Sequence, residues 1–306
     1  MGLLQQYKDS LKIVEAEEIF DLLIYRPLAF IFVKITYPLN FLTPNLVSSM
    51  AMFAGVAAGV MFGFGSYQYL LYGACLYFLC NVLDCADGQI ARLKKNGTKV
   101  GRIVDGFIDY IVSIAVFIGI GIGMTQEYSI GKLVPWGNIF NMSPYVYIWG
   151  ITILAAISSA VQAFLFDFYR NKYMEVVYNR FSPLEDEIKE YKAELERIEL
   201  EPDKAGFLDS LLITLYLKYT GLQMLIQSNK AVHEEEFKPN PKVYYLHNKP
   251  LLRLWSFIGS TTHITICVIS ALLGNMEIFL IICILPLNLL SAFLYLAQSK
   301  VNIKLN

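Results

Sequence analysis

The stretch Asp84-Cys85-Ala86-Asp87-Gly88-Gln89-Ile90-Ala91-Arg92, with Gly101, Asp105 and Asp109 shortly after it, decides how this chain folds. Each of its two halves adjoins an apolar run long enough to cross a bilayer. An ionised side chain at the centre of a membrane helix costs about 2.5–3.5 kcal/mol. Four acids beside such runs therefore need a physical explanation.

The spacing of these acids places them on common helix faces. Asp84 and Asp87 are three residues apart, and Asp105 and Asp109 are four apart, so each pair shares one face of a helix. The connection between the pairs is short and contains the turn dipeptide Asn-Gly at 96–97. It predicts antiparallel neighbouring helices that aim two carboxylates each at one point.

Converging carboxylates require cations. At 5 Å and an effective dielectric of 20, each pair repels by roughly 3 kcal/mol. An all-oxygen cluster of hard ligands suits Mg²⁺ or Mn²⁺, and four acids are enough for two ions. Gly101 would leave room for the other helix or a ligand. The alternatives are acids that pair with arginines, cap helices or line the ion path of a transporter.

The composition indicates a lipid-embedded protein. Of the 306 residues, 56% are hydrophobic and the net charge is −1, so apolar side chains exceed the needs of one water-soluble core. Nothing in the composition indicates a nucleic-acid partner. The five cysteines all fall within apolar stretches and lack the paired spacing of a zinc or redox site.

Six stretches reach the roughly 17–25 apolar residues that a membrane-spanning helix needs. They lie near 46–64, 67–85, 103–124, 144–167, 254–273 and 276–298. An earlier run, 26–42, is broken by a lysine and a proline and predicts an interfacial helix. The sequence thus predicts an all-α integral membrane protein, a six-transmembrane-helix bundle with an N-terminal interfacial helix and a cytoplasmic helical insert.

The distribution of basic residues predicts the orientation. With the N-terminus inside, the outer connections are 65–68, 125–143 and 274–275. Of 25 Lys and Arg residues, only Lys132 lies in them. By the positive-inside rule, the acids and both termini face the cytoplasm in a multi-pass protein.

Residues 181–250 form a polar insert. The capping box at 182–185 and the apolar spacing after it predict an amphipathic helix ending near Pro202, which either packs on the cytoplasmic face or self-associates. The run 207–226 is long enough to span, but crossing would move later lysines outside, so we place it on the membrane surface or against the cytoplasmic parts. The predicted division is 1–43 for the N-terminal amphipathic or interfacial helices, 44–180 and 251–300 for the membrane domain, and 181–250 for the insert.

From Asp84 through Asp109 the chain matches D-x2-D-G-x2-A-R-x8-G-x3-D-x3-D at every fixed position, and this stretch resembles the signature of the CDP-alcohol phosphotransferases. The Thr-Pro-Asn-Leu-Val-Ser stretch at 43–48 also resembles the turn before the first span of that family. The resemblance implies that an acceptor hydroxyl attacks the β-phosphorus of a CDP-alcohol and releases CMP. It also implies two Mg²⁺ or Mn²⁺ ions and a homodimer.

The resemblance assigns roles by position. Asp109 would be both a metal ligand and the general base, and Arg92 would hold donor phosphates or, alternatively, snorkel at the interface as an ordinary positive-inside residue. The other metal ligands would be Asp84, Asp87 and Asp105. The other donor contacts would be Asn45, Leu46, Val47, Ser48, Gly88, Ala91, Thr98 and Gly101, with Gly88 and Ala91 leaving room for the cytidine.

Polar residues elsewhere have two interpretations each. Basic residues after the fourth span and before the fifth either bind a phosphorylated acceptor or supply ordinary positive-inside charge. They are Arg170, Lys172, Arg180 and Arg253. His263 and Asp167 either make satisfied hydrogen bonds inside the bundle or contact substrate.

The motif does not identify the alcohols. The leading hypothesis is a phospholipid synthase that joins CDP-diacylglycerol to inositol phosphate, glycerol phosphate or serine, because the bundle is compact and basic residues cluster near the site. The alternative is transfer from soluble CDP-choline, CDP-ethanolamine or a CDP-polyol to a lipid hydroxyl. A transporter or a non-catalytic scaffold is the rival of another class.

Overall fold

The computed structural model describes residues 2–11, 13–39, 41–94, 99–126, 143–179, 184–200, 210–211, 213–214, 216–217 and 240–305. Within these residues all regular structure is helical. Six helical segments there are long and apolar enough to cross a membrane: Pro44–Gly63, Tyr67–Lys94, Ile103–Gln126, Pro144–Tyr178, Pro241–Leu272 and Met276–Ile303. The predicted all-α membrane bundle is confirmed.

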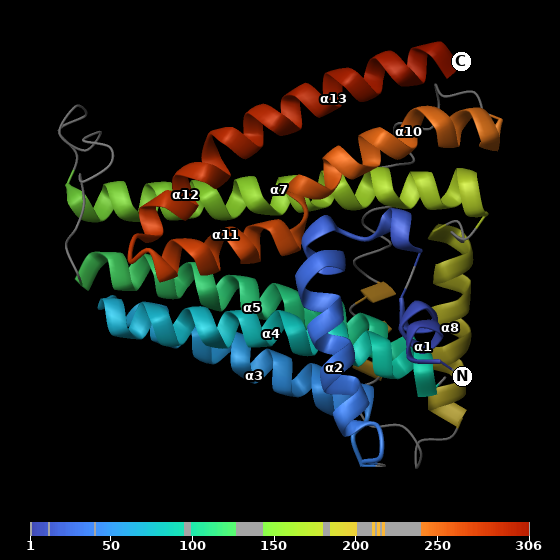
Figure 1. Cartoon of the computed structure of the whole chain (residues 1–306), viewed down its shortest axis with the longest axis horizontal. Helices are drawn as coiled ribbons and strands as arrows, with labels where there is room; N and C mark the ends of the chain where they lie inside the picture. Colours follow the sequence, from blue (N-terminus) through green and yellow to red (C-terminus); the bar gives the residue numbers. More distant parts are fainter. Residues whose placement is uncertain are drawn as a thin grey trace.

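The first four spans are continuous helices (Figure 1). They are α3 (Pro44–Gly63), α4 (Tyr67–Lys94), α5 (Lys99–Gln126) and α7 (Pro144–Tyr178). α4 and α7 extend about two turns or more beyond the predicted ends at 85 and 167, because a helix can continue through polar residues past the end of its apolar run. α7 ends at Tyr178, and its C-cap residue, Asn179, adopts a left-handed φ of 50°.

The last two spans are interrupted helices, which the hydropathy pattern did not predict. They comprise α10 (Pro241–Trp255), the 3₁₀ turn η4 (Ser256–Ile258) and α11 (Ser260–Leu272), then α12 (Met276–Ile284) and α13 (Pro286–Leu305). Pro286 has no N–H to continue the α12 ladder, so the helix breaks there. The Gln162 side chain of α7 donates to the Cys283 carbonyl at 2.9 Å and satisfies an acceptor beside the break.

The N-terminal segment lies across the charged end of α4 (Figure 1). It consists of α1 (Leu3–Ser10), the 3₁₀ turn η1 (Val14–Ala16), the π-helical turn η2 (Asp21–Tyr25) and α2 (Arg26–Thr36). A helix does occupy the predicted run 26–42, although it ends at Thr36. Its interfacial location stays a prediction.

α3 packs closely along both α4 and α5. Its contact with α5 depends on glycines, because a Cβ at Gly119 would lie 1.9 Å from the Gly59 carbonyl oxygen and one at Gly123 would lie 2.0 Å from that of Phe62. Lipid removes most of the hydrophobic drive for helices to associate, so close backbone packing of small residues becomes a main source of attraction.

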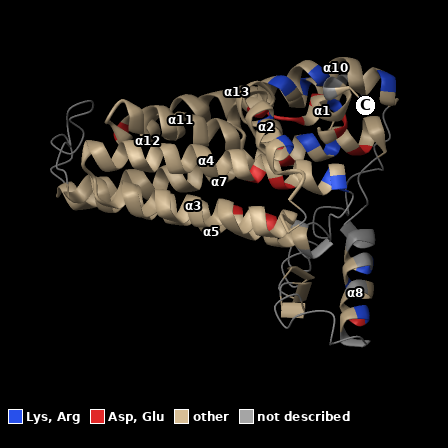
Figure 2. Ribbon diagram, turned by 60° about the horizontal axis from the view of Figure 1, so that its bottom comes forward, with Lys and Arg blue, Asp and Glu red and all other residues tan. Residues whose placement is uncertain are grey.

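The charged residues gather at one end of the bundle, where α1, α10 and the C-terminus lie (Figure 2). Both chain ends are at this end (Figure 1). α8 (Leu184–Leu200) confirms the helix predicted in the insert. Residues 182–183 of its predicted cap, and 207–226 apart from a few positions, lie outside the described residues. The boundary predicted at 250 falls inside α10.

Candidate functional site

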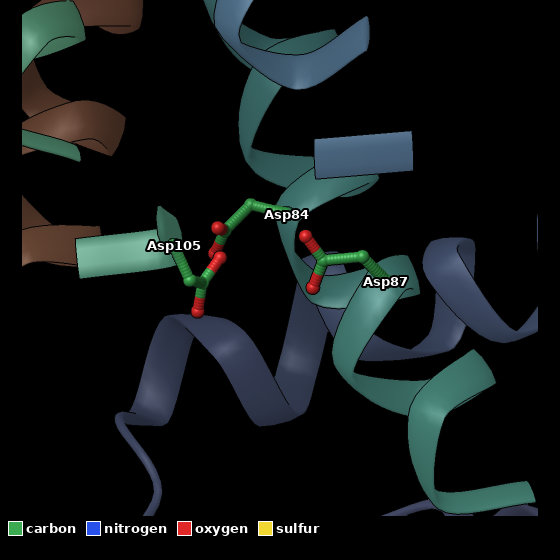
Figure 3. Close-up of side chains that lie close together, drawn as sticks. All are labelled: Asp84, Asp87 and Asp105. Carbon is green, nitrogen blue, oxygen red and sulfur yellow. The ribbon is translucent and has the colours of Figure 1, made fainter. Parts of the chain in front are cut away.

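Three of the four acids converge between α4 and α5. One carboxylate oxygen from each of Asp84, Asp87 and Asp105 lies within 4.8 Å of the other two. Their side chains point toward one another (Figure 3). Asp87 is only 5% exposed, while Asp84 and Asp105 are half-buried. The convergence predicted from the spacing is therefore confirmed for these three carboxylates.

Asp109 lies one turn further along α5 and is exposed. It is outside the three-carboxylate cluster found among the described residues. The carboxylates of Asp109 and Asp84 nevertheless lie close enough to repel each other. Its carboxylate thus borders the cluster and is exposed on the surface of α5.

The two acid-bearing helices meet through their side chains rather than through close backbone packing. α4 and α5 make only sparse backbone contact along their described lengths, whereas α3 packs closely on each. The glycine contact draws α5 toward α3, and the acids reach across from α4 and α5 with their side chains. The contact between α4 and α5 at this point is therefore made by carboxylate oxygens and not by backbone atoms.

The start of α3 lies beside the cluster. The Thr43 hydroxyl accepts a hydrogen bond from the Leu46 amide at 3.3 Å and caps the helix. Asn45 and Leu46 are exposed, and Val47 is buried. Ser48 is also buried, and its hydroxyl donates to Oδ2 of Asp87. Among the residues predicted to contact nucleotide, Ser48 is thus tied directly to an acid of the cluster.

The remaining motif residues lie on both sides of the acids. Gly88, Ala91 and Gly101 are half-buried, and a Cβ at Gly88 would come within 3.3 Å of the Arg92 guanidinium. Arg92 Nε donates to the backbone carbonyl of Ser10 at 2.6 Å, so this guanidinium engages the N-terminal segment. Thr98 lies outside the described residues.

A polar network that sequence reasoning missed joins the N-terminal segment to the bundle. Arg26 and Glu17 form a buried ion pair at 2.7 Å. The Glu18 carboxylate accepts from the Thr261 amide at 3.0 Å, at the start of α11. Burial, with repulsion from Asp21, raises the pKa of Glu18 well above its ordinary value, and burial raises the pKa of Asp21 as well.

Glu15 anchors the same segment to α7 and α10. It accepts hydrogen bonds from Lys249 at 2.7 Å, Tyr178 at 2.5 Å, Tyr245 at 3.1 Å and Tyr173 at 3.2 Å. Burial acts to raise the pKa of Glu15, but these hydrogen bonds, led by that from Lys249, outweigh burial and lower it to about 2. The sequence signal for this network is the run of acids Glu15, Glu17, Glu18 and Asp21 in the N-terminal segment.

Other predicted polar residues have intramolecular partners. Asp167 pairs with Arg170 at 2.9 Å. Arg253 donates to the carbonyls of Val14 at 2.8 Å and Glu17 at 3.1 Å. Arg180 lies outside the described residues.

His263 is buried, and its Nε2 lies 2.7 Å from Oε1 of Gln162. Because Gln162 belongs to α7 and His263 to α11, this contact confirms the predicted interhelical hydrogen bond.

The donor set of the cluster fits a hard divalent cation. It consists of carboxylate oxygens from two helices, which Mg²⁺ and Mn²⁺ prefer. Cys85, the nearest sulfur in sequence, instead lies 3.5 Å from Asp21 of the N-terminal segment. A bound cation would also relieve the mutual repulsion of the three acids.

Six apolar helical segments and an acidic cluster at the charged end define a multi-pass integral membrane protein with a candidate divalent-metal site. Residues 41–184 match the CDP-alcohol phosphatidyltransferase family, and the chain carries a domain of that family. It is similar to the phosphatidylinositol phosphate synthases of Mycobacterium tuberculosis, at 35% identity over 80 residues, and of Mycobacterium marinum, at 36% over 80 residues. These matches cover 26% of this chain and only 36% and 33% of the two relatives, about a third of their length.

Proposed function

We propose that this protein is a membrane-embedded CDP-alcohol phosphotransferase of phospholipid biosynthesis. The observation that carries the proposal is a complete family motif whose acids Asp84, Asp87 and Asp105 bring their oxygens within 4.8 Å of one another. In the reaction, the acceptor hydroxyl oxygen forms a bond to the β-phosphorus of the donor. The bond from that phosphorus to the oxygen of CMP breaks, and CMP leaves as a phosphodiester is formed.

CDP-diacylglycerol is the proposed donor, and a small polar alcohol is the proposed acceptor. The similar mycobacterial proteins are named for phosphatidylinositol phosphate synthesis, which favours inositol phosphate among the three acceptors considered. Glycerol phosphate and serine are the others. A site at the boundary between charged and apolar parts of the bundle suits a reaction between a lipid and a soluble molecule (Figure 2).

The acids would supply the ion site and the base. Asp84, Asp87 and Asp105, with Asp109, would hold two Mg²⁺ or Mn²⁺ ions, and these would neutralise charge on the pyrophosphate and on the departing CMP. The exposed Asp109 carboxylate would accept the proton of the acceptor hydroxyl. An aspartate has an ordinary pKa of about 3.9 and is a weak base, so the site must also make that hydroxyl more acidic.

The donor contacts follow from the motif. The half-buried Gly88 and Ala91 would lie against the cytidine, with Gly101 beside the ligand and the start of α3 against the nucleotide. Arg92 and Thr98 would hold the phosphates. Nε of Arg92 is bound to the Ser10 carbonyl, so its two terminal nitrogens would supply the donors to the phosphates.

We infer that the acidic site and both termini face the cytoplasm. The supporting observation is the concentration of basic residues at that end of the described bundle (Figure 2), as the positive-inside rule requires. The division into 1–43, a membrane domain of 44–180 and 251–300, and the insert 181–250 is part of the same proposal. So is homodimerisation, which rests on family resemblance.

Purified protein incubated with one labelled CDP-alcohol at a time tests the proposal. We expect CMP release from CDP-diacylglycerol in the presence of one of the three acceptors. Release only from CDP-choline, CDP-ethanolamine or a CDP-polyol with a lipid hydroxyl would overturn the donor assignment, and no release from any donor would overturn the function.

A matched pair of variants tests the base. Asp109→Asn should lower turnover by roughly 10²–10⁴-fold, the usual contribution of a general base, while nucleotide binding persists. Asp167→Asn is the control, since Asp167 lies on α7 and pairs with Arg170. Equal activity of the Asp109→Asn protein and the control would refute the role of Asp109.

A further inference from the structure

Ser48 and Asp87 form a buried contact between two helices. They are 39 residues apart in sequence, on α3 and α4, and are 7% and 5% exposed. The Ser48 hydroxyl oxygen lies within hydrogen-bond distance of two acceptors, Oδ2 of Asp87 and, at 3.1 Å, the carbonyl of Pro44. A serine hydroxyl has one proton and donates to one acceptor at a time.

The carboxylate is the stronger of the two acceptors. Hydrogen bonds to an ionised group are roughly twice as strong as those between neutral groups. The bond to Pro44 is the ordinary return of a helical serine to the carbonyl four residues earlier, which costs little to give up. When Asp87 is ionised, the Ser48 hydroxyl therefore donates its hydrogen bond to Asp87 rather than to Pro44.

This bond restricts how the Asp87 carboxylate turns. An ionised carboxylate offers about four lone-pair positions, and Ser48 occupies one of them on Oδ2. One oxygen of Asp87 lies within 4.8 Å of a carboxylate oxygen of Asp84 and of one of Asp105. The Asp87 carboxyl group is turned toward both (Figure 3). Rotation of the carboxyl group would break the bond to Ser48, so the hydroxyl holds the remaining lone pairs toward the cluster.

The same bond supports the charge that a cation requires. Asp87 is buried beside two other acids, and a buried ionised group without a hydrogen-bond donor is strongly disfavoured. The hydroxyl supplies such a donor before any ion arrives. Groups that orient metal-binding carboxylates in this way typically change metal affinity or activity by 10–100-fold when removed.

We propose that Ser48 is a positioning residue that fixes the Asp87 carboxylate for binding a divalent cation. This inference rests on the proposed function, in which the three acids hold a catalytic cation. It differs from the nucleotide contact that the family resemblance implies for Ser48. A nucleotide contact acts only when donor is present. A positioning residue affects cation binding even when no donor is present.

Titration of the purified full-length protein with Mn²⁺ in detergent micelles, followed by the loss of the free-ion paramagnetic signal and without any CDP-alcohol, separates the two roles. Ser48→Ala should weaken Mn²⁺ binding by about 10–100-fold. Ser49→Ala is the control, because the half-buried Ser49 donates to the Asn45 carbonyl at 2.9 Å. That variant should bind Mn²⁺ like the unchanged protein.

Unchanged Mn²⁺ affinity in Ser48→Ala, with a raised KM for the donor, would overturn the positioning role and leave the proposed function intact. An unchanged protein that binds Mn²⁺ but transfers nothing would refute the function alone, and one that binds no Mn²⁺ would refute both. Should Ser48→Ala fail to fold, Ser48→Cys keeps the volume and substitutes a weak donor for the hydroxyl. Its affinity for Mn²⁺ should fall in the same direction.

Discussion

The glycine contact between α3 and α5 predicts that one added methyl group destabilises the bundle. In Gly119→Ala the new Cβ would lie 1.9 Å from the Gly59 carbonyl oxygen and 2.7 Å from its carbon. Both are backbone atoms, so no side-chain rotation relieves the clash, and the helices must separate by about 1.5 Å to restore van der Waals contact. Overpacking typically costs about 1–3 kcal/mol, against a gain of about 1 kcal/mol for replacing a helical glycine by alanine.

We therefore expect Gly119→Ala to lower the free energy of unfolding by about 2 kcal/mol, at the upper end of the net range because the contact is backbone on backbone. Denaturant unfolding of the micellar protein, monitored by tryptophan fluorescence, measures this change. Gly150→Ala on α7 is the matched control, since a Cβ there meets nothing within 4 Å. It should be neutral or stabilising by up to about 1 kcal/mol. A Gly119→Ala protein as stable as this control would refute the reasoning.

The other predictions concern the ion site and the N-terminal anchor. Chelation should lower the thermal midpoint, and Mg²⁺ or Mn²⁺ at 100 times its Kd should restore about 2.7 kcal/mol of stability; no change on chelation would contradict an ion site. The Glu15 pKa of about 2 lies below the ordinary value of 4.5, so Glu15 stabilises the fold above pH 4.5 and loses this effect as the pH falls toward 2. Glu15→Gln should accordingly be less stable than the unchanged protein at pH 7. The gap should shrink toward pH 3 in thermal unfolding, and a gap independent of pH would contradict the charge-based account.

The membrane bundle was predictable because its signals are local. A run of apolar residues specifies a spanning helix wherever it packs, and all six spans were found. The convergence of Asp84, Asp87 and Asp105 was likewise predictable, since three- and four-residue spacing fixes a helix face regardless of context. In both cases the deciding information lies within one or two turns of helix.

The features that sequence reasoning missed depend on partners far along the chain. Gly119 matters because Gly59 faces it, and Glu15 matters because residues of α7 and α10 meet it. The sequence around each of these residues contains no local pattern that identifies the residues it contacts. The packing of α3 along both α4 and α5 is likewise a contact between helices that no local pattern in the sequence identifies.

The geometry of α4 explains why the arginine of the motif contacts the N-terminal segment and not the acids. At 3.6 residues per turn, Arg92 lies five residues and about 140° around the helix from Asp87. It shares a stripe with Cys85 and Gln89, which contact Asp21 and the Arg26 carbonyl of that same segment. One face of α4 thus carries acids and the adjacent face is bound to the N-terminus. If Arg92 holds donor phosphates as proposed, its terminal nitrogens would do so while Nε stays bound to the Ser10 carbonyl, so the N-terminal segment would help to orient the guanidinium.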